Sequence, residues 1–290
     1  MQNTNTGIQV YSLKDFNGMI RSERTDSYLK DVLSGRADSF KANITALVSN
    51  NVALQSCEPH STLFAAIKAT VLDLPLDSNL GFAYVIPYKD NKKNDTVAQF
   101  QIGYKGFIQL AIRSGQFSKI NVIEIKDGEI EGFDLMSGDI ILKKDFSPEY
   151  IQKERCKLQT VGYYAYFKLV NGFEKSVYWS IEKIIEHAKK YSKSYNSFNS
   201  VYKTNPNEMY AKTVLKNLLS KWAPLSIQMS DAIRYDQAVI KENGGVEYVD
   251  SPNFSDTSAD NDKVTDLLNT AFDDLTPEQQ QQAISELESN

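Results

Sequence analysis

The sequence predicts an α+β fold: antiparallel β-hairpins of a β-meander flanked by helices, followed by a polar, acidic C-terminal tail. Two observations favour this class. Apolar residues recur at helical spacing before residue 75 and again after residue 180. Between these segments, short strand-like runs are separated by turn residues, and such short connections join antiparallel strands. We expect three regions: a loosely ordered N-terminal segment (1–34), a core domain (35–243), and a linker with an acidic tail (244–290).

Two helices are expected in the first part of the core domain. One covers residues 38–57, and the other runs from Glu58 to Leu74. Pro59 suits the first turn of the second helix, because the N–H that proline lacks has no intrahelical partner there. A strand over residues 82–88 and an exposed turn follow.

The stretch GYKG, residues 103–106, is typical of a tight turn between a strand and a helix. The helix is expected to begin near Lys105 and to end at Gly115, a natural C-cap. Lys105, Gln109 and Arg113 share its polar side, because residues four apart lie on one face. Helix N-termini also attract anions. The turn could serve packing alone, or it could hold a phosphate with Tyr104 and Lys105 beside it.

The middle of the chain predicts strands over residues 119–125, 130–146 and 160–179. In the last of these, Asn171-Gly172 favours a hairpin with a two-residue primed turn. That register places Lys168 opposite Lys175, which is unfavourable unless the lysines are solvated or an anion lies between them.

A helix is expected after Ser180, which is a suitable N-cap. Lys183, His187 and Lys190 form a stripe along it, although His187 could equally border the core. A further helix is expected to begin at Asn205-Pro206 and to carry Lys212, Thr213 and Lys216 on one face.

The segment between these two helices mixes aromatic and basic residues with Asn and Ser. It has too little aliphatic content to form its own core. Lysines beside aromatic rings are typical of grooves for single-stranded nucleic acid, where charge follows the backbone and rings stack on bases. The residues concerned are Lys189, Lys190, Tyr191, Lys193, Tyr195, Tyr202 and Lys203.

The net charge of −5 conceals an asymmetry. Residues 150–222 contain 13 basic and 5 acidic side chains, whereas residues 251–290 contain 1 basic and 9 acidic ones. This distribution indicates a polyanionic ligand for the basic block and a separate role for the tail. A pair of charged surface helices is the alternative. The tail contains two short amphipathic segments, which could dock to a partner or simply be solvated.

Motifs for bond-making chemistry are absent from the sequence. No phosphate-binding loop of the GxxxxGK[ST] type occurs, and the two histidines, His60 and His187, have no metal-ligand spacing. Cys57 and Cys156 form no redox or metal motif. We therefore expect a binding protein with no metal and no cofactor. The absence of a signal peptide and of a long apolar run predicts a cytoplasmic protein without membrane association.

Several segments, in this order, resemble the RecT-type phage recombinases, which are single-strand DNA annealing proteins. The resemblance spans roughly residues 35–235 and is carried by LDLPLDSNLGFAYVIPYKD, QFQIGYKGFIQLAIRSGQF, the hairpin with EKSVYWSIEKIIEHAKKYSKS, and MYAKTVLKNLLSKWAPLS. It implies an ATP-independent, phage- or prophage-encoded protein of the bacterial cytoplasm. Such a protein coats single-stranded DNA, pairs it with its complement, and forms a ring or filament.

The resemblance also implies partners: a phage 5′-to-3′ exonuclease and the host single-strand-binding protein. One rival is an oligomeric phage scaffolding protein that does not anneal DNA, and another is an enzyme acting on a small molecule or nucleotide. The candidate DNA-binding residues are Tyr104, Lys105, Gln109, Arg113, Lys168, Lys175, Lys183, His187, Lys189, Lys190, Tyr191, Lys193, Tyr195, Tyr202, Lys203, Lys212, Thr213 and Lys216.

Overall fold

The computed structural model describes residues 11–90, 94–143, 147–196, 200–241 and 245–248. These residues form an α+β fold with antiparallel strand pairing throughout, which confirms the predicted class. The two amphipathic tail segments lie outside the described residues. None of the described helices is long and apolar enough to cross a membrane.

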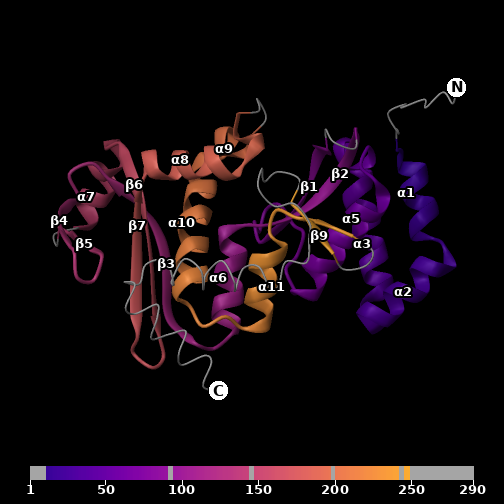
Figure 1. The fold of residues 1–290 in the computed structure, drawn as a ribbon, viewed down its shortest axis with the longest axis horizontal. Coiled ribbons are helices and arrows are strands. Elements are labelled where there is room, and N and C mark those ends of the chain that lie inside the picture. Colours follow the sequence, from indigo (N-terminus) through magenta and orange to yellow (C-terminus); the bar gives the residue numbers. More distant parts are fainter. Residues whose placement is uncertain (1–10, 91–93, 144–146, 197–199, 242–244, 249–290) are drawn as a thin grey trace, which may run out of the picture. The chain divides into compact units, whose positions relative to one another are not determined.

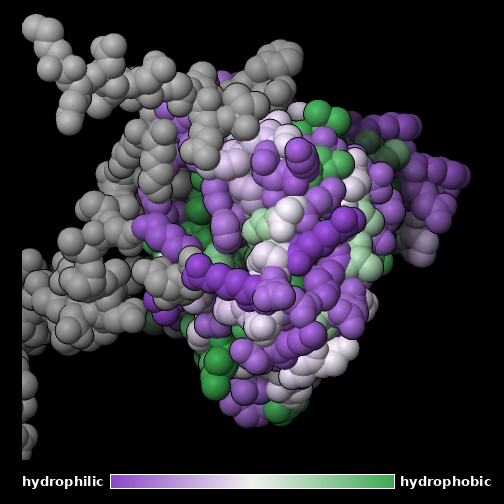
Figure 2. Space-filling model, turned by 90° about the vertical axis from the view of Figure 1, so that its right-hand side faces the viewer, coloured by the Kyte–Doolittle hydropathy of each residue, from purple (hydrophilic) through white to green (hydrophobic). Residues whose placement is uncertain are grey.

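The N-terminal part of the chain is helical. It contains α1 (Leu13–Ile20), α2 (Glu23–Leu33), η1 (Ser34–Arg36), α3 (Ala37–Ser49), α4 (Val52–Gln55) and α5 (Pro59–Val71). The expectation of a loosely ordered segment is wrong for α1 and α2, because both bury apolar residues. Phe16, Ile20, Leu29 and Leu33 join the main hydrophobic core. Short helices of this kind are stabilised by tertiary packing rather than by intrinsic propensity, which explains why the sequence did not reveal them. The side on which these helices lie is largely hydrophilic (Figure 2).

The strands in the described part of the chain form four small antiparallel sheets. Strands β1 (Ala83–Asp90) and β2 (Asp95–Ile102) make one hairpin, and helix α6 (Tyr104–Arg113) follows it. A three-stranded sheet has the order β3-β6-β7. Its strands are β3 (Phe117–Lys126), β6 (Thr160–Leu169) and β7 (Glu174–Ser180). In the sequence, β3 and β6 are separated by the hairpin of β4 (Ile130–Asp134) and β5 (Asp139–Leu142), by α7 (Pro148–Lys153) and by η2 (Arg155–Lys157).

The C-terminal elements are α8 (Ile181–Tyr191), η3 (Lys193–Asn196), α9 (Val201–Thr204), α10 (Pro206–Trp222), α11 (Ile227–Tyr235), β8 (Val239–Ile240) and β9 (Val246–Glu247). Among them, α8 and α10 pack on the three-stranded sheet, whereas α11 and β8 pack near α6 and β2. Helix α10 lies along the sheet, and α8 and α9 lie at its N-terminal end (Figure 1). Buried Leu215 and Leu218 of α10 belong to the same core as Ala165 and Phe167 of β6. Val246 and Glu247, which belong to the predicted linker, form strand β9 and pair with β8.

The turn between β6 and β7 differs from the prediction. The N–H of Leu169 donates to the carbonyl of Phe173 (2.8 Å), and the N–H of Gly172 donates to the carbonyl of Leu169 (3.1 Å). The loop thus has three residues, with Gly172 at φ +92°, which is the arrangement of a turn followed by a left-handed residue. The one-residue change in register pairs Lys168 with Glu174 rather than with Lys175. The predicted like-charge pair is therefore wrong.

The two glycines of the GYKG stretch allow a close backbone approach. A Cβ on Gly103 would lie 2.1 Å from the carbonyl oxygen of Gly81, and one on Gly106 would lie 2.2 Å from that of Phe82. The N–H of Gly103 donates to the same Phe82 carbonyl at 3.0 Å. Both glycines are therefore required for packing, whatever the turn binds.

Replacing Gly106 by Ala should lower the free energy of unfolding by about 1–3 kcal/mol or more, because the new methyl group overlaps a backbone carbonyl. The matched control is Gly18→Ala in α1, where a Cβ meets no atom within 4 Å. That change should stabilise the helix by about 0.5–1 kcal/mol. Urea unfolding of both variants measures the difference, and equal midpoints would contradict the close approach.

Candidate nucleic-acid interface

Helix α8 carries three exposed lysines on its outer side, together with exposed Glu182 and Glu186. The hydroxyl of Ser180 accepts from the N–H of Lys183 (3.3 Å) and caps the helix as predicted. Ile184 and Ala188 are buried, so the opposite side faces solvent. Exposed lysines on that side are Lys183, Lys189 and Lys190, and none of them forms an ion pair within the described part of the chain.

Aromatic rings lie beside these lysines. The ring of His187 is 5.2 Å from that of Trp179 and 4.6 Å from that of Tyr191, measured between centroids. The Nζ of Lys183 lies 4.9 Å from the Trp179 ring, and that of Lys190 lies 5.2 Å from the Tyr191 ring. Tyr191 is 44 % exposed, so its ring is accessible to a ligand.

A second row of aromatic rings leads from the segment after α8 into the core. Tyr195 contacts Tyr202 (5.6 Å), Tyr202 contacts Tyr210 (6.4 Å), and Tyr210 contacts Tyr163 (5.8 Å). Tyr163 is the cross-strand partner of Trp179, so the two rows meet at the sheet. The sequence did not single out Tyr163 or Tyr210, because aromatic residues in strands and helices are most often core residues.

The imidazole of His187 has a lowered pKa. Burial is the main cause, and the positive charges of Lys216 and Lys190 add to it. Its Nδ1 atom is buried and has no hydrogen-bond partner in the described structure. His187 is therefore neutral near pH 7. Its partly buried ring lies between those of Trp179 and Tyr191, so it borders the core, which is one of the two alternatives that the sequence left open. An anion beside Lys190 would favour its protonation.

The start of α6 lies close to Gly81 and Tyr84. The charge of Glu208, in the first turn of α10, contributes to the raised pKa of Tyr84, as does Tyr104; burial is the largest cause. A Cβ on Gly81 would lie 3.1 Å from the Tyr84 hydroxyl and 3.8 Å from the Nζ of Lys105. Lys105 thus lies beside Tyr84 near the N-terminus of α10, and it forms no ion pair with the described residues. Tyr84 is a further candidate that the sequence did not reveal.

The three residues predicted on one exposed face of α10 are mainly internal. Lys212 is 4 % exposed, and its Nζ lies 2.8 Å from Oδ1 of Asp236. Lys216 is partly exposed and lies 2.7 Å from Oδ2 of the same carboxylate. Thr213 is buried, and its hydroxyl donates to the Met209 carbonyl (2.7 Å). The prediction that Lys212 and Thr213 line an exposed groove is therefore wrong.

The buried carboxylate of Asp236 is the counter-charge of both Lys212 and Lys216. Burial lowers the pKa of Lys212 to about 8, while Asp236 opposes this shift. The two lysines in turn hold the pKa of Asp236 below its usual value despite burial. Oδ1 of Asp236 also accepts from the N–H of Ile102 (3.0 Å). The group is a structural ion-pair network in the middle of α10, and only Lys216 reaches toward the surface.

The remaining candidates are separated from α8. Arg113, at the end of α6 opposite Lys105, donates to the Leu72 carbonyl and to Asp73, both at 3.3 Å. Lys168 pairs with Glu174 (3.2 Å) at the far end of the β6–β7 hairpin. The seven residues of β7 separate that end from α8 by about 20 Å.

Lys175 lies at the same far end, bonded to the Ser137 carbonyl and 5.4 Å from the Trp222 ring. Lys203 donates to the Asn196 carbonyl (3.0 Å), and Gln109 lies partly exposed on α6. Lys193 is in η3, but its side chain lies outside the described part of the structure. The candidates that the described contacts bring together are thus those of α8 and of the segment after it, whereas Lys105 lies beside Tyr84 at the start of α6.

Replacing Asp236 by Asn should lower the free energy of unfolding by about 3–5 kcal/mol, because Lys212 would remain buried without its counter-charge. Asp231→Asn is the matched control. Asp231 is 37 % exposed and pairs with Lys68 at 3.2 Å, so its loss should remove at most about 1 kcal/mol. Urea unfolding of the full chain measures both, and a small loss at Asp236 would contradict its structural role.

Comparison with known proteins identifies the family of this chain. The model of the RecT family matches residues 38–250, which contain every candidate named above. The uncharacterized protein YqaK of Bacillus subtilis (strain 168) is 39% identical over 241 residues, covering 83% of this chain and 76% of that protein. Protein RecT of Escherichia coli (strain K12) is 28% identical over 187 residues, covering 64% of this chain and 65% of that protein. The chain therefore belongs to the RecT family, whose proteins act in DNA recombination by annealing single strands.

Proposed function

We propose that this protein binds single-stranded DNA and anneals it to a complementary strand without nucleotide hydrolysis, as an oligomeric ring or filament. The observation that carries the proposal is the group of exposed lysines on α8, which have no carboxylate partners among the described residues and lie beside aromatic rings, of which Tyr191 is exposed. Lys105, at the start of α6, forms no described ion pair and is a further proposed contact for the DNA backbone.

Annealing requires a particular division of contacts. The protein must hold phosphates and present bases, because contacts to base edges would block pairing and impose a sequence. Lysines on a helix can follow the backbone, and partly exposed tyrosines can stack on bases of any sequence. The protein then supplies charge neutralisation and proximity, and Watson–Crick pairing supplies specificity. Annealing of this kind makes and breaks no covalent bond, so the protein has no catalytic residue.

Partners follow from the same mechanism. Single strands must be produced from duplex DNA, which a 5′-to-3′ exonuclease of the same phage would do. The host single-strand-binding protein would compete for the strands or hand them over. The acidic residues 251–290 cannot favour DNA phosphates, so the tail would serve such a protein partner or solubility.

The most direct test of function is annealing of two complementary oligonucleotides by the purified chain without nucleotide. Quenching of a dye pair reports duplex formation. We expect faster annealing than with the strands alone, and weaker binding at higher salt. A chain that self-assembles but changes neither annealing nor DNA mobility would favour the scaffolding alternative.

The double variant Lys189→Ala/Lys190→Ala should weaken binding to single-stranded DNA and reduce its salt dependence. Removing one phosphate contact lowers the slope of log affinity against log salt by about 0.7. Lys30→Ala/Lys153→Ala is the control with equal charge change, since both lysines lie in exposed surface ion pairs elsewhere. Fluorescence anisotropy over a range of salt concentrations gives both slopes. Identical slopes in the two double variants would contradict the proposal that Lys189 and Lys190 contact DNA phosphates.

Replacing Tyr191 by Leu should weaken binding but leave the salt slope unchanged, because a stacking ring is removed and the charge stays the same. Base stacking on an aromatic ring contributes about 1–3 kcal/mol, which corresponds to roughly 5- to 150-fold in affinity. Tyr28→Leu is the control: Tyr28 is 38 % exposed on α2 and contacts Phe64. If both variants bind as the unmodified chain does, Tyr191 does not stack on DNA.

A further inference from the structure

The imidazole of His187 carries a polar atom that has no partner in the described structure. Its Nδ1 is buried and forms no hydrogen bond there. The other histidine differs, because the Nδ1 of His60 lies 3.0 Å from Oε1 of Glu58. Buried polar side chains are mostly hydrogen-bonded, and the exceptions often have a functional role. His187 can therefore change its protonation without breaking an existing hydrogen bond at Nδ1.

Positive charge approaches this imidazole from two elements. On α8, Lys183 and Lys190 lie four residues before and three residues after His187, so the three side chains share one face. From α10, the ammonium group of Lys216 also acts on His187, and it lies 2.7 Å from the carboxylate of Asp236. Neither of the two α8 lysines has a carboxylate partner among the described residues, so their charges are available to an anion.

The other described neighbours of α8 in this region are aromatic. Besides α10, the helix packs against β6, β7 and η3, which contribute Tyr163, Trp179 and Tyr195. The carboxylates nearest in the sequence, those of Glu182 and Glu186, are exposed. Both lie about 100° or more around the helix from the imidazole. An anion on the lysine face is thus supplied by a ligand rather than by these two carboxylates.

Two aromatic rings flank the imidazole. Its centroid lies 5.2 Å from that of Trp179 and 4.6 Å from that of Tyr191. A cation this close to an aromatic ring is attracted by the negative charge of the ring face. The two rings therefore favour the protonated form of His187, whereas burial and the lysines oppose it. An added anion shifts this balance toward the protonated form.

The pKa of His187 determines the direction of the coupling. In the free chain this pKa lies below its ordinary value, mainly through burial and then through Lys216 and Lys190. A phosphate that contacts Lys190 offsets one of these positive charges, and its own negative charge raises the pKa. Between the pKa of the free chain and that of the bound chain, binding takes up a proton, so the affinity falls as the pH rises. Outside this interval the imidazole has the same charge in both states, and the affinity does not depend on it.

We propose that His187 takes up a proton from the solvent when a backbone phosphate of the bound strand contacts Lys190. The imidazolium then becomes a further cationic contact of the interface, next to the lysines of α8. Because every phosphodiester carries the same charge, this contact imposes no sequence. The inference rests on the proposed binding of single-stranded DNA, and it adds that mildly acidic solution strengthens the binding.

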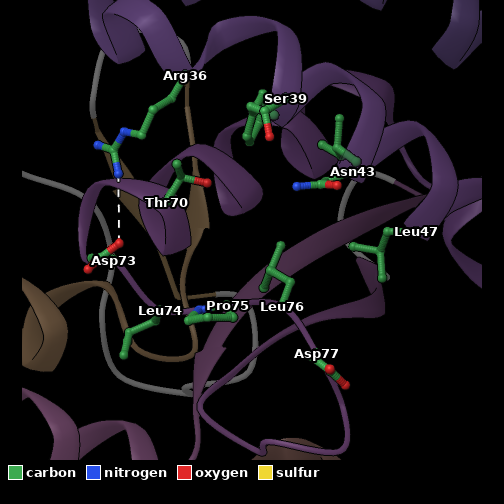
Figure 3. Close-up of a pocket in the computed structure, with 12 residues that line it drawn as sticks. Arg36, Ser39, Asn43, Leu47, Thr70, Asp73, Leu74, Pro75, Leu76 and Asp77 are labelled. Carbon is green, nitrogen blue, oxygen red and sulfur yellow. Dashed lines mark ion pairs between the residues drawn. The ribbon is translucent and has the colours of Figure 1, made fainter.

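The cavity of about 440 Å³ between α3 and the segment that follows α5 is less suitable for a phosphate (Figure 3). Apolar residues such as Phe40 and Leu74 form much of its wall. The Arg36 guanidinium already pairs with Asp73 at 3.7 Å, and Asp77 adds a second carboxylate. Helix α3 and α8 also lie in different parts of the ribbon (Figure 1). Arg36 therefore provides a control cation that is away from the proposed interface.

Binding of oligothymidylate tests the proposal, because thymine neither pairs with itself nor titrates near neutral pH. Fluorescence anisotropy gives the affinity from about pH 5.5 to 8.5 at constant ionic strength. The unmodified chain should bind more weakly as the pH rises, by up to about tenfold per pH unit at the steepest point. His187→Phe keeps a ring between Trp179 and Tyr191 but cannot be protonated, so it should lose this dependence. His60→Gln and Arg36→Gln should keep it.

Two further readings separate proton uptake from a role of His187 in packing. Lys212, whose pKa is about 8, titrates at the upper end of the range, and its contribution remains in every variant. Calorimetry in two buffers of different ionisation enthalpy counts the protons directly. The unmodified chain should take up a fraction of a proton per copy within the interval, and His187→Phe should take up less. The slope of log affinity against log salt should also be steeper at the acidic end by up to about 0.7, but only in chains that keep His187.

Equal pH dependence in the unmodified chain and in a folded His187→Phe chain would overturn the proposal, and so would the absence of proton uptake by the unmodified chain. If oligothymidylate binds with one affinity at every pH, the inference fails while the proposed function stands. If it binds at no pH, the proposed function itself fails, and the inference with it. Far-ultraviolet circular dichroism verifies the fold, and the calorimetry of the unmodified chain needs no variant.

Discussion

The buried carboxylate of Asp236 connects the elements on which the proposed interface depends. It accepts from the N–H of Ile102 at the end of β2, and it pairs with Lys212 and Lys216 of α10. Asp236 itself is the C-cap of α11. Because Ile102 directly precedes the turn that starts α6, one side chain fixes α6, α10 and α11 to one another. A buried ion pair of this kind contributes little more net stability than an apolar contact would. Removing one partner, however, lowers the free energy of unfolding severely, so the ion pair favours this one arrangement of α6, α10 and α11.

The network also determines which basic residues can meet a ligand. Residues 150–222 have a large positive excess, yet part of that charge is used inside the protein. Lys212 is buried against Asp236, Arg155 lies 2.7 Å from the buried Glu129, and Lys168 pairs across its hairpin. Three of the lysines that keep no carboxylate partner in the described structure, Lys183, Lys189 and Lys190, lie on α8. A net charge summed over the sequence therefore overstates the charge of the interface and does not show where it lies.

The sequence predicted elements well where local rules decide them. Helix α8 begins after Ser180 and α10 begins at Pro206, as capping and proline preferences indicated, although the Asn205 side chain makes no cap hydrogen bond. The hairpin was predicted from Asn171-Gly172, but its register was not, because this dipeptide fits both a two-residue and a three-residue loop. One residue of difference moved Lys168 and Lys175 to opposite faces of the sheet. The exposure of a candidate was predictable where it follows from helical period, as for Lys183 and Lys190. The exposure of a candidate was not predictable where a partner distant in the sequence determines it. Lys212 is buried because it pairs with Asp236, 24 residues away, and either residue alone resembles a solvated surface charge.

The central claim is that α8 and the start of α6 hold the DNA backbone while Lys212 remains inside. Acetylation of lysines in the full chain, read by mass spectrometry with and without single-stranded DNA, tests it most directly. We expect DNA to protect Lys105, Lys183, Lys189 and Lys190, whereas Lys30 and Lys153 should react equally in both states and Lys212 should be unreactive in both. Unchanged reactivity along α8, or a Lys212 that reacts freely until DNA is added, would contradict it.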